Sequence, residues 1–285
     1  MDNRRYSEES LRWVLKREIT IKNFTIYKQD QGRTELHYAC KDNKAWIARA
    51  CIAFNDDDIN APDEYGSTPL HQACLYAHVD VVKLLVESGA KSSLYLKDHA
   101  GSIPIDGAIY NDKVDTVKLL LSYHEEDKEM ALENLGDAFV MVAQKQNLEM
   151  VKLFLGVCPD IIHSRSAEDR RTALHRSCLH SDDTEVMEFL LIFGAGVNVV
   201  DDYGQIPLIA AANCGRPECA KVLLAAGANV NHRINRIPGG MTPLDFALAN
   251  VDGSTGRAEI VELLEAAGGL TGAQLPHDDD DDGGA

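Results

Sequence analysis

Apolar residues along the chain fall into pairs of short helical runs separated by polar turns. The stretch from residue 66 to residue 90 shows this pattern most fully: Thr68 is a helix-capping residue, and Pro69 suits the first position of a helix. Apolar residues then recur at helical spacing over residues 70–74 and again over residues 81–86. The pattern predicts a hairpin of two short helices.

This two-helix unit repeats along the chain. A small residue marks the first run of each unit at intervals of 34 to 36 residues, at Ala39, Ala73, Ala108, Ala143 (or Val142 in the same unit), Ser177, Ala211 and Ala247. A second apolar run follows each marker. Because one hairpin cannot bury both of its apolar faces, successive hairpins are expected to stack on one another and share a core. The recurrence therefore predicts seven stacked helix pairs.

The sequence around these markers resembles the ankyrin-repeat family. Residues 68–73 read Thr-Pro-Leu-His-Gln-Ala, and weaker versions begin at Thr34, Ile103, Thr172, Ile206 and Thr242. The family has a period of about 33 residues with a T-P-L-H-x-A signature. The resemblance implies an all-α solenoid of stacked helix-turn-helix units, joined by short finger loops that look like β-hairpins. Fingers are expected at residues 59–66 and 197–204.

The same patterns suggest how the chain is organised. We expect a capping helix and connector in residues 1–28, the repeat array in residues 29–269, and a disordered acidic tail in residues 270–285. The array is degenerate near residues 123–160, where a helix-favouring run replaces the expected finger. Residues 231–240 lengthen a later finger and add two arginines, which we interpret as a solvated loop or as a contact for an acidic group.

Composition limits the classes of partner. The formal net charge is -17, and five of the negative charges lie in Asp278–Asp282. Acidity of this size argues against nucleic acid or an anionic membrane as a partner and favours a protein with a basic surface. The run itself is expected to solvate the chain, with attraction of a basic partner as the alternative. We expect a monomer.

The chain is expected neither to enter nor to cross a membrane. No signal-peptide core is present near the N-terminus, and no stretch approaches the roughly 20 apolar residues of a membrane span. The seven cysteines are an odd number, and Cys40, Cys51, Cys74 and Cys178 occupy apolar repeat positions. They are predicted to be buried, reduced thiols, which suits the cytoplasm or the nucleus.

Chemical motifs are few. A His-x-x-Cys pattern occurs three times, at His37, His71 and His175, and on a helix this spacing places both side chains on one face, as a zinc site requires. The family resemblance instead gives each histidine a hydrogen-bonding role in the turn. No phosphate loop, nucleophile elbow or dinucleotide motif is present. We therefore expect no metal, no cofactor and no enzymatic activity.

The resemblance implies a protein-interaction module, an adaptor or scaffold that binds its partner on the concave face formed by finger tips and first helices. Acidic finger residues complete the expected contact set, which is Asp63, Glu64, Tyr65, Ser67, Leu75, Tyr76, His99, Ser102, Tyr110, Asn111, Asp201, Asp202, Tyr203, Gln205 and Asn213. Tyr65 and Tyr203 share one register, and each is interpreted either as a binding residue or as a ring packed on its own finger. The alternative function is a regulatory or assembly-chaperone subunit that masks a basic surface of an enzyme or transcription factor.

Overall fold

The computed structural model describes residues 31–54, 59–124, 128–234, 236, 240–249 and 255–276. These residues form two units, the first ending at Tyr123 and the second beginning at His124, and each unit is described by itself. The predicted capping helix in residues 1–28, the acidic residues 56–58 and the acidic run in residues 278–282 lie outside the described residues.

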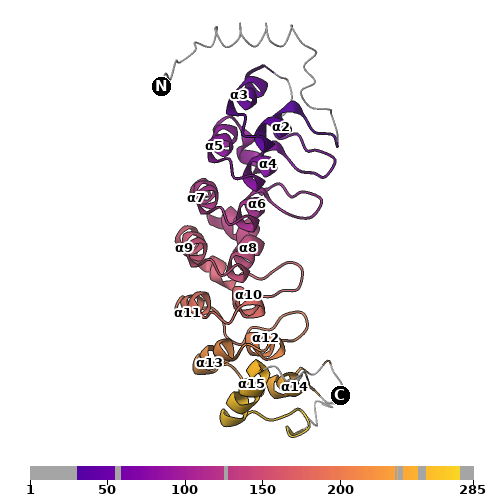
Figure 1. The fold of residues 1–285 in the computed structure, drawn as a ribbon, viewed down its shortest axis with the longest axis vertical. Helices are drawn as coiled ribbons and strands as arrows, with labels where there is room; N and C mark the ends of the chain where they lie inside the picture. Colours follow the sequence, from indigo (N-terminus) through magenta and orange to yellow (C-terminus); the bar gives the residue numbers. More distant parts are fainter. Residues whose placement is uncertain are drawn as a thin grey trace, which may run out of the picture. The chain divides into compact units, whose positions relative to one another are not determined.

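The first unit consists of three helix pairs and one short 3-10 helix. Its elements are α2 (Glu35–Lys41), α3 (Ala45–Phe54), α4 (Pro69–Leu75), α5 (Val79–Glu87), η1 (Ala90–Tyr95), α6 (Pro104–Tyr110) and α7 (Val114–Ser122). Figure 1 shows the first helices of the pairs in one row, the second helices in another, and the finger loops projecting from the row of first helices.

The second unit consists of four helix pairs and a second 3-10 helix. Its elements are α8 (Lys128–Gln144), α9 (Leu148–Val157), η2 (Pro159–His163), α10 (Ala173–His180), α11 (Glu185–Ile192), α12 (Pro207–Cys214), α13 (Pro217–Ala225), α14 (Pro243–Ala249) and α15 (Thr255–Ala266). The two rows and the projecting loops recur here (Figure 1). The seven predicted helix pairs are thus present in the described parts of the chain, and the all-α repeat fold is confirmed.

The helices start where the repeat signature predicts. Thr68 caps α4, and Pro69 occupies the first turn. Thr34 and Thr172 cap α2 and α10 in the same way. The marker residues are buried, and Ala73 has an exposed fraction of 0%. Small residues at these positions allow neighbouring helices to approach closely, and apolar residues of both rows complete the core.

The degenerate region contains the predicted helical run, which lengthens the first helix of its pair. α7 ends at Ser122 and the 17-residue helix α8 begins at Lys128, so no finger-length loop separates them. The fingers elsewhere are tight turns, and the described residues contain two isolated β-bridges, Arg165 with Thr172 and Ile234 with Met241.

One expectation at the C-terminus is wrong. Residues 270–276 were assigned to a disordered tail, but the Leu270 N–H donates to Asn231 Oδ1 at 2.8 Å and the Gly272 N–H donates to Asp245 Oδ2 at 2.7 Å. These partners lie about 30 to 40 residues earlier in the chain, so the contacts cannot be predicted from the local sequence.

Candidate functional site: finger loops and first helices

Three fingers are closed by an aspartate at the start of the turn. The Oδ1 atom of Asp63 accepts hydrogen bonds from the N–H groups of Tyr65 and Ser67, both at 2.9 Å. Asp98 and Asp201 repeat this pattern with the N–H groups two and four residues further on, at 2.8 to 2.9 Å. Each turn therefore has a fixed backbone, because its N–H groups are satisfied by one carboxylate.

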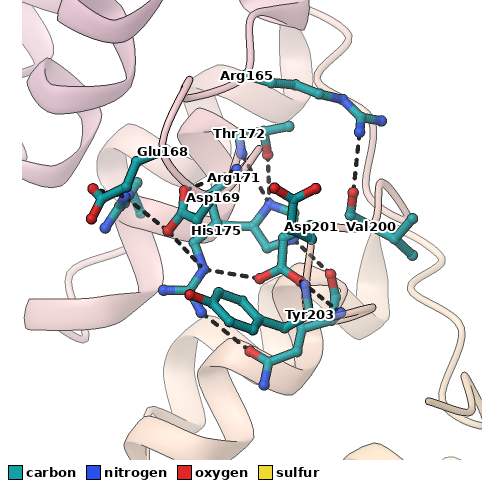
Figure 2. Close-up of polar contacts among 12 residues, drawn as sticks. Arg165, Glu168, Asp169, Arg171, Thr172, His175, Val200, Asp201 and Tyr203 are labelled. Atoms are coloured by element: carbon teal, nitrogen blue, oxygen red, sulfur yellow. Dashed lines mark hydrogen bonds and ion pairs between the residues drawn. The ribbon is translucent and has the colours of Figure 1, made fainter. Parts of the chain in front are cut away.

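In two of these fingers, the aspartate forms a buried ion pair with an arginine of the preceding finger. Arg33 Nε lies 3.0 Å from Asp63 Oδ2, and Arg171 Nε lies 2.9 Å from Asp201 Oδ2. Figure 2 shows Arg171 held between Asp169 and Asp201. Both Asp63 and Asp201 side chains have an exposed fraction of 0%, so the arginine offsets the cost of burying their charge.

Three histidines provide a second link between fingers. His71 Nδ1 accepts a hydrogen bond from the Thr68 N–H at 3.1 Å, and its Nε2 lies 3.1 Å from the carbonyl oxygen of Ser102 in the next finger. His37 and His175 make the same contacts, to Ser67 and Gln205 respectively. The backbone N–H must donate, so Nδ1 carries no proton and Nε2–H donates to the carbonyl. The hydrogen-bonding role that the family resemblance gave these histidines is confirmed.

Each of the two ion-paired fingers presents an exposed tyrosine. The exposed fraction is 51% for Tyr65 and 59% for Tyr203. The guanidinium carbon of Arg171 lies 5.5 Å from the centroid of the Tyr203 ring, within the range of a cation–π contact. Part of the Tyr203 ring therefore packs on an arginine of the preceding finger, and the rest of the ring is exposed.

A second exposed group lies at the C-terminal ends of α4 and α6 in the first unit. Leu75, Tyr76 and Tyr110 have exposed fractions of 38%, 43% and 68%. Asn111 Nδ2 donates to the Leu75 carbonyl oxygen at 2.7 Å, which joins the two helix ends. We call Leu75, Tyr76, Tyr110 and Asn111 the helix-end surface.

The neighbours of Tyr76 hold its ring in place. The ring stacks on His78 with a centroid separation of 6.2 Å, and Lys41 Nζ lies 5.8 Å from its centroid. His78 Nε2 in turn lies 2.9 Å from the Lys41 carbonyl oxygen. The ring is thus ordered before any partner binds, which lowers the entropic cost of binding.

The corresponding helix ends of the second unit carry different chemistry. Asn213, at the end of α12, is exposed, and its carbonyl oxygen accepts a hydrogen bond from Arg257 Nη2 at 3.0 Å. The end of α12 thus presents an amide side chain beside Arg257, at the position that Leu75 occupies on α4.

The structure separates the predicted contact residues into three groups. The exposed residues are Glu64, Tyr65, Leu75, Tyr76, His99, Tyr110, Asn111, Asp202, Tyr203 and Asn213. Ser102 and Gln205 are half-buried. Asp63, Ser67 and Asp201 are buried, with exposed fractions of 5%, 8% and 5%. The expectation that Asp63 and Asp201 lie on the finger surface is wrong, because both carboxylates point inward to the backbone of their turns.

Arg33 and Arg171 were missed by the sequence analysis. Each immediately precedes the capping threonine of its repeat, at Thr34 and Thr172. This shared position is the one sign in the sequence that the two arginines have a common role. It does not identify their partners, because the paired aspartates lie 30 residues further along the chain.

The cysteines and histidines are occupied by packing and hydrogen bonds. Cys40, Cys74 and Cys178 are buried free thiols, as predicted, and burial raises the pKa of Cys40 and Cys74. A histidine of this kind would have to give up its link to the next finger in order to bind zinc. Within the described residues, no group of three or more His, Cys, Asp and Glu side chains is placed to hold a metal ion.

Repeated helix pairs with rigid, side-chain-presenting fingers define a repeat scaffold with an extended interaction surface. The family model described as ankyrin repeats (3 copies) matches residues 5–98, 105–199 and 178–270. The chain belongs to the ankyrin-repeat family, whose repeats are a protein-interaction module.

Individual relatives cover different shares of the chain. The probable 26S proteasome regulatory subunit p28 of Saccharomyces cerevisiae is 32% identical over 194 residues, which are 65% of this chain and 80% of that protein. The E3 ubiquitin-protein ligase KEG of Arabidopsis thaliana is 25% identical over 184 residues, which are 61% of this chain and 11% of KEG. The crystal structure of the human ASB11 ankyrin repeat domain matches with a TM-score of 0.66 at 22% identity, and the match covers 84% of this chain and 99% of that one.

None of the described helices is both long enough and apolar enough to cross a bilayer.

Proposed function

We propose that this chain is a non-enzymatic adaptor or scaffold that binds a partner protein through the fingers and first helices. The observation that carries the proposal is the group of exposed aromatic side chains in the first unit. Tyr110 is 68% exposed, and Tyr76 is exposed although its ring is already packed on one side. Tyrosine is enriched at the hot spots of protein interfaces because it contributes a large contact area at low entropic cost.

The binding surface in the first unit comprises the helix-end surface together with Tyr65 and Glu64 on the finger. The His99 N–H donates to the Tyr65 carbonyl oxygen at 2.8 Å, so neighbouring fingers are held in register beside this surface. A partner therefore meets a surface whose backbone is fixed. The expected interface is standard in size, with the tyrosines near its centre.

The test compares binding by the wild type with that of two variants. A double variant, Tyr76→Ala and Tyr110→Ala, removes the tyrosines of the helix-end surface, whereas Trp46→Ala removes a 53% exposed aromatic side chain from the second-helix row. Partners are captured by affinity purification and their Kd values are measured by calorimetry. We expect the double variant to lose binding by about 100-fold while Trp46→Ala binds normally. Equal losses in both variants would contradict the proposed face.

The net charge adds a proposal about the partner. A chain with a net charge of -17 attracts a basic protein at long range, and Glu64 and Asp202 supply exposed carboxylates on the fingers. The buried, free thiols suit a reducing compartment, so we place the interaction in the cytoplasm or the nucleus.

The yeast relative favours a second candidate function. Its name describes a probable regulatory subunit of the 26S proteasome, and the match covers 80% of its length. By this similarity we propose, as the alternative, that the chain is a regulatory or assembly-chaperone subunit that masks a basic surface of an enzyme complex. Affinity purification probed for proteasome subunits distinguishes the two functions, because an adaptor for another partner would recover none of them.

A further inference from the structure

Helix α11 exposes large apolar side chains that its core packing does not explain. Its buried residues are Val186, Met187 and Leu190. Ile192 and Phe193 lie at the surface instead, with exposed fractions of 81% and 51%. A surface helix normally carries polar residues opposite its buried face. Contiguous apolar side chains at a protein surface are typical of an interaction site.

Phe189 joins these two residues in one patch. It precedes them by three and four positions, so all three lie on the same side of the helix. The ring centroids of Phe189 and Phe193 are 4.5 Å apart. Lys152 Nζ of the neighbouring helix α9 lies over the Phe189 ring, 5.3 Å from its centroid. We call Phe189, Ile192 and Phe193 the α11 patch.

The repeat itself does not require a large apolar residue at the position of Ile192. In the six other second helices the corresponding positions hold small or charged residues, namely Ala53, Glu87, Ser122, Gly156, Ala225 and Ala266. Among the described residues, no large apolar side chain is more exposed than that of Ile192. The other repeats stack without an apolar side chain here, so Ile192 is not needed for the fold. Its burial against a partner would be favourable.

The charge beside the patch differs from that of most repeats. The residues that correspond to Glu188 in five other second helices are basic, namely Arg49, Lys83, Lys118, Lys152 and Lys221. Glu185 and Glu188 each lie four residues before a member of the α11 patch, and therefore beside it on the helix surface. The chain has no lysine or arginine in residues 177–215. Two carboxylates thus border the patch, and the Lys152 ammonium group is already placed over Phe189.

We propose that the α11 patch docks a basic amphipathic helix of a partner protein. The apolar face of that helix covers Ile192 and Phe193, and its lysines or arginines pair with Glu185 and Glu188. A second copy of this chain is a poorer occupant, because an isologous contact would bring the same carboxylates of both copies together. The site goes beyond the proposed function, because α11 lies in the row of second helices and not among the fingers and first helices (Figure 1).

The experiment measures binding of a basic amphipathic probe. A fluorescent peptide of leucine and lysine, with the leucines at helical spacing, is titrated into the wild-type chain and into a double variant, Ile192→Ser with Phe193→Ser. We expect saturable binding to the wild type and binding weaker by about tenfold or more for the variant. Both side chains are more than half exposed, so the variant is expected to keep the wild-type melting temperature. No saturable binding to the wild type, or equal binding to both, would overturn the proposal.

Matched carboxylate variants separate the site from the net charge of the chain. Glu185→Gln together with Glu188→Gln is expected to weaken peptide binding about fivefold. Glu262→Gln together with Glu265→Gln removes two exposed carboxylates from α15 of the same unit and is expected to leave binding unchanged. Equal losses in the two variants would show that the peptide is attracted by net charge only, and would refute the site.

Two further measurements distinguish the α11 patch from other surfaces. Tyr76→Ala together with Tyr110→Ala, which tests the helix-end surface, is expected to leave peptide binding unchanged, so that either surface can fail without the other. Sedimentation of the chain alone tests the second copy as occupant. We expect no self-association through α11. A dimer that dissociates on Ile192→Ser would assign the patch to self-association and overturn the proposal.

Discussion

The position of a carboxylate within the finger decides whether it is structural or available to a partner. Asp201 and Asp202 are neighbours in sequence, yet Asp201 is 5% exposed and Asp202 is exposed. Asp201 accepts two backbone hydrogen bonds and pairs with Arg171. Asp202 lies 3.9 Å from Arg170 at the surface, where an ion pair contributes little to stability.

These two residues provide a matched test. Asp201→Ala is expected to lower the free energy of unfolding by about 3 to 5 kcal/mol, because it leaves two turn N–H groups without their acceptor and removes the nearer of the two carboxylates that pair with Arg171. Asp202→Ala is expected to change it by at most about 0.5 kcal/mol. Urea unfolding of both variants measures the difference. A similar loss in both would show that the Asp201 ion pair is not a structural element.

The packing between helices depends on small residues at particular points of contact. In α6, a Cβ atom at Gly107 would lie 3.0 Å from Leu75 Cα in the neighbouring helix α4. In α9, a Cβ atom at Gly156 would meet nothing within 4 Å. The two glycines thus share a helical setting but differ in their surroundings, and only Gly107 permits a close approach of two backbones.

Alanine substitution separates these roles. Gly156→Ala is expected to stabilise the protein by about 0.5 to 1 kcal/mol, because alanine has the higher helix propensity. Gly107→Ala is expected to destabilise it by about 1 to 3 kcal/mol, because the α4 backbone must shift. Thermal unfolding of the two variants is the measurement, and stabilisation by Gly107→Ala would contradict the packing described.

Over the whole molecule, the histidine links make the fold sensitive to acid. Burial lowers the pKa of His37, His71 and His175 from the ordinary value of 6.5. Protonation of Nδ1 would also place two donors against each other at the capping threonine. The folded protein therefore favours the neutral histidines, and below pH 6.5 the unfolded chain binds more protons.

Stability is accordingly expected to be fully present above pH 6.5 and to fall as the pH decreases below it. Each histidine contributes at most about 1.4 kcal/mol per pH unit in this range. The free energy of unfolding is measured by urea denaturation between pH 7.5 and 5.5. His71→Gln is expected to show a weaker pH dependence, whereas the exposed His163→Gln shows the wild-type dependence. A flat profile for the wild type would rule out the neutral histidine links.

The charge of the whole molecule predicts salt-dependent association with a basic partner. Charges nearly balance in the described residues of the first unit, with nine Lys and Arg and ten Asp and Glu in residues 31–54 and 59–123. The long-range attraction therefore comes from the rest of the acidic chain, and Glu64 is expected to add to it locally. Glu64→Gln together with Asp202→Asn should slow association and flatten its dependence on ionic strength. Stopped-flow rates with the captured partner test this, and unchanged rates would remove these residues from the encounter surface.

The sequence alone was enough to predict the repeat period, the helix pairs, the capping of α4 by Thr68 and the burial of Ala73. These features follow from interactions within a few residues, namely helix caps and helical periodicity. It also indicated the long helix α8, because a helix-favouring run stands there in place of finger residues. Tyr65 and Tyr203 were identified as finger residues through their shared register.

Tertiary packing determines which finger carboxylates are buried and which cations pair with them. Asp63 and Arg33 are 30 residues apart, and the Arg233 contact to Pro276 spans 43 residues. Such contacts depend on how one repeat stacks on the next, which sets the alignment of successive fingers. The local sequence specifies each turn but not the finger that packs against it. It therefore does not show that Asp63 is buried and Glu64 is exposed.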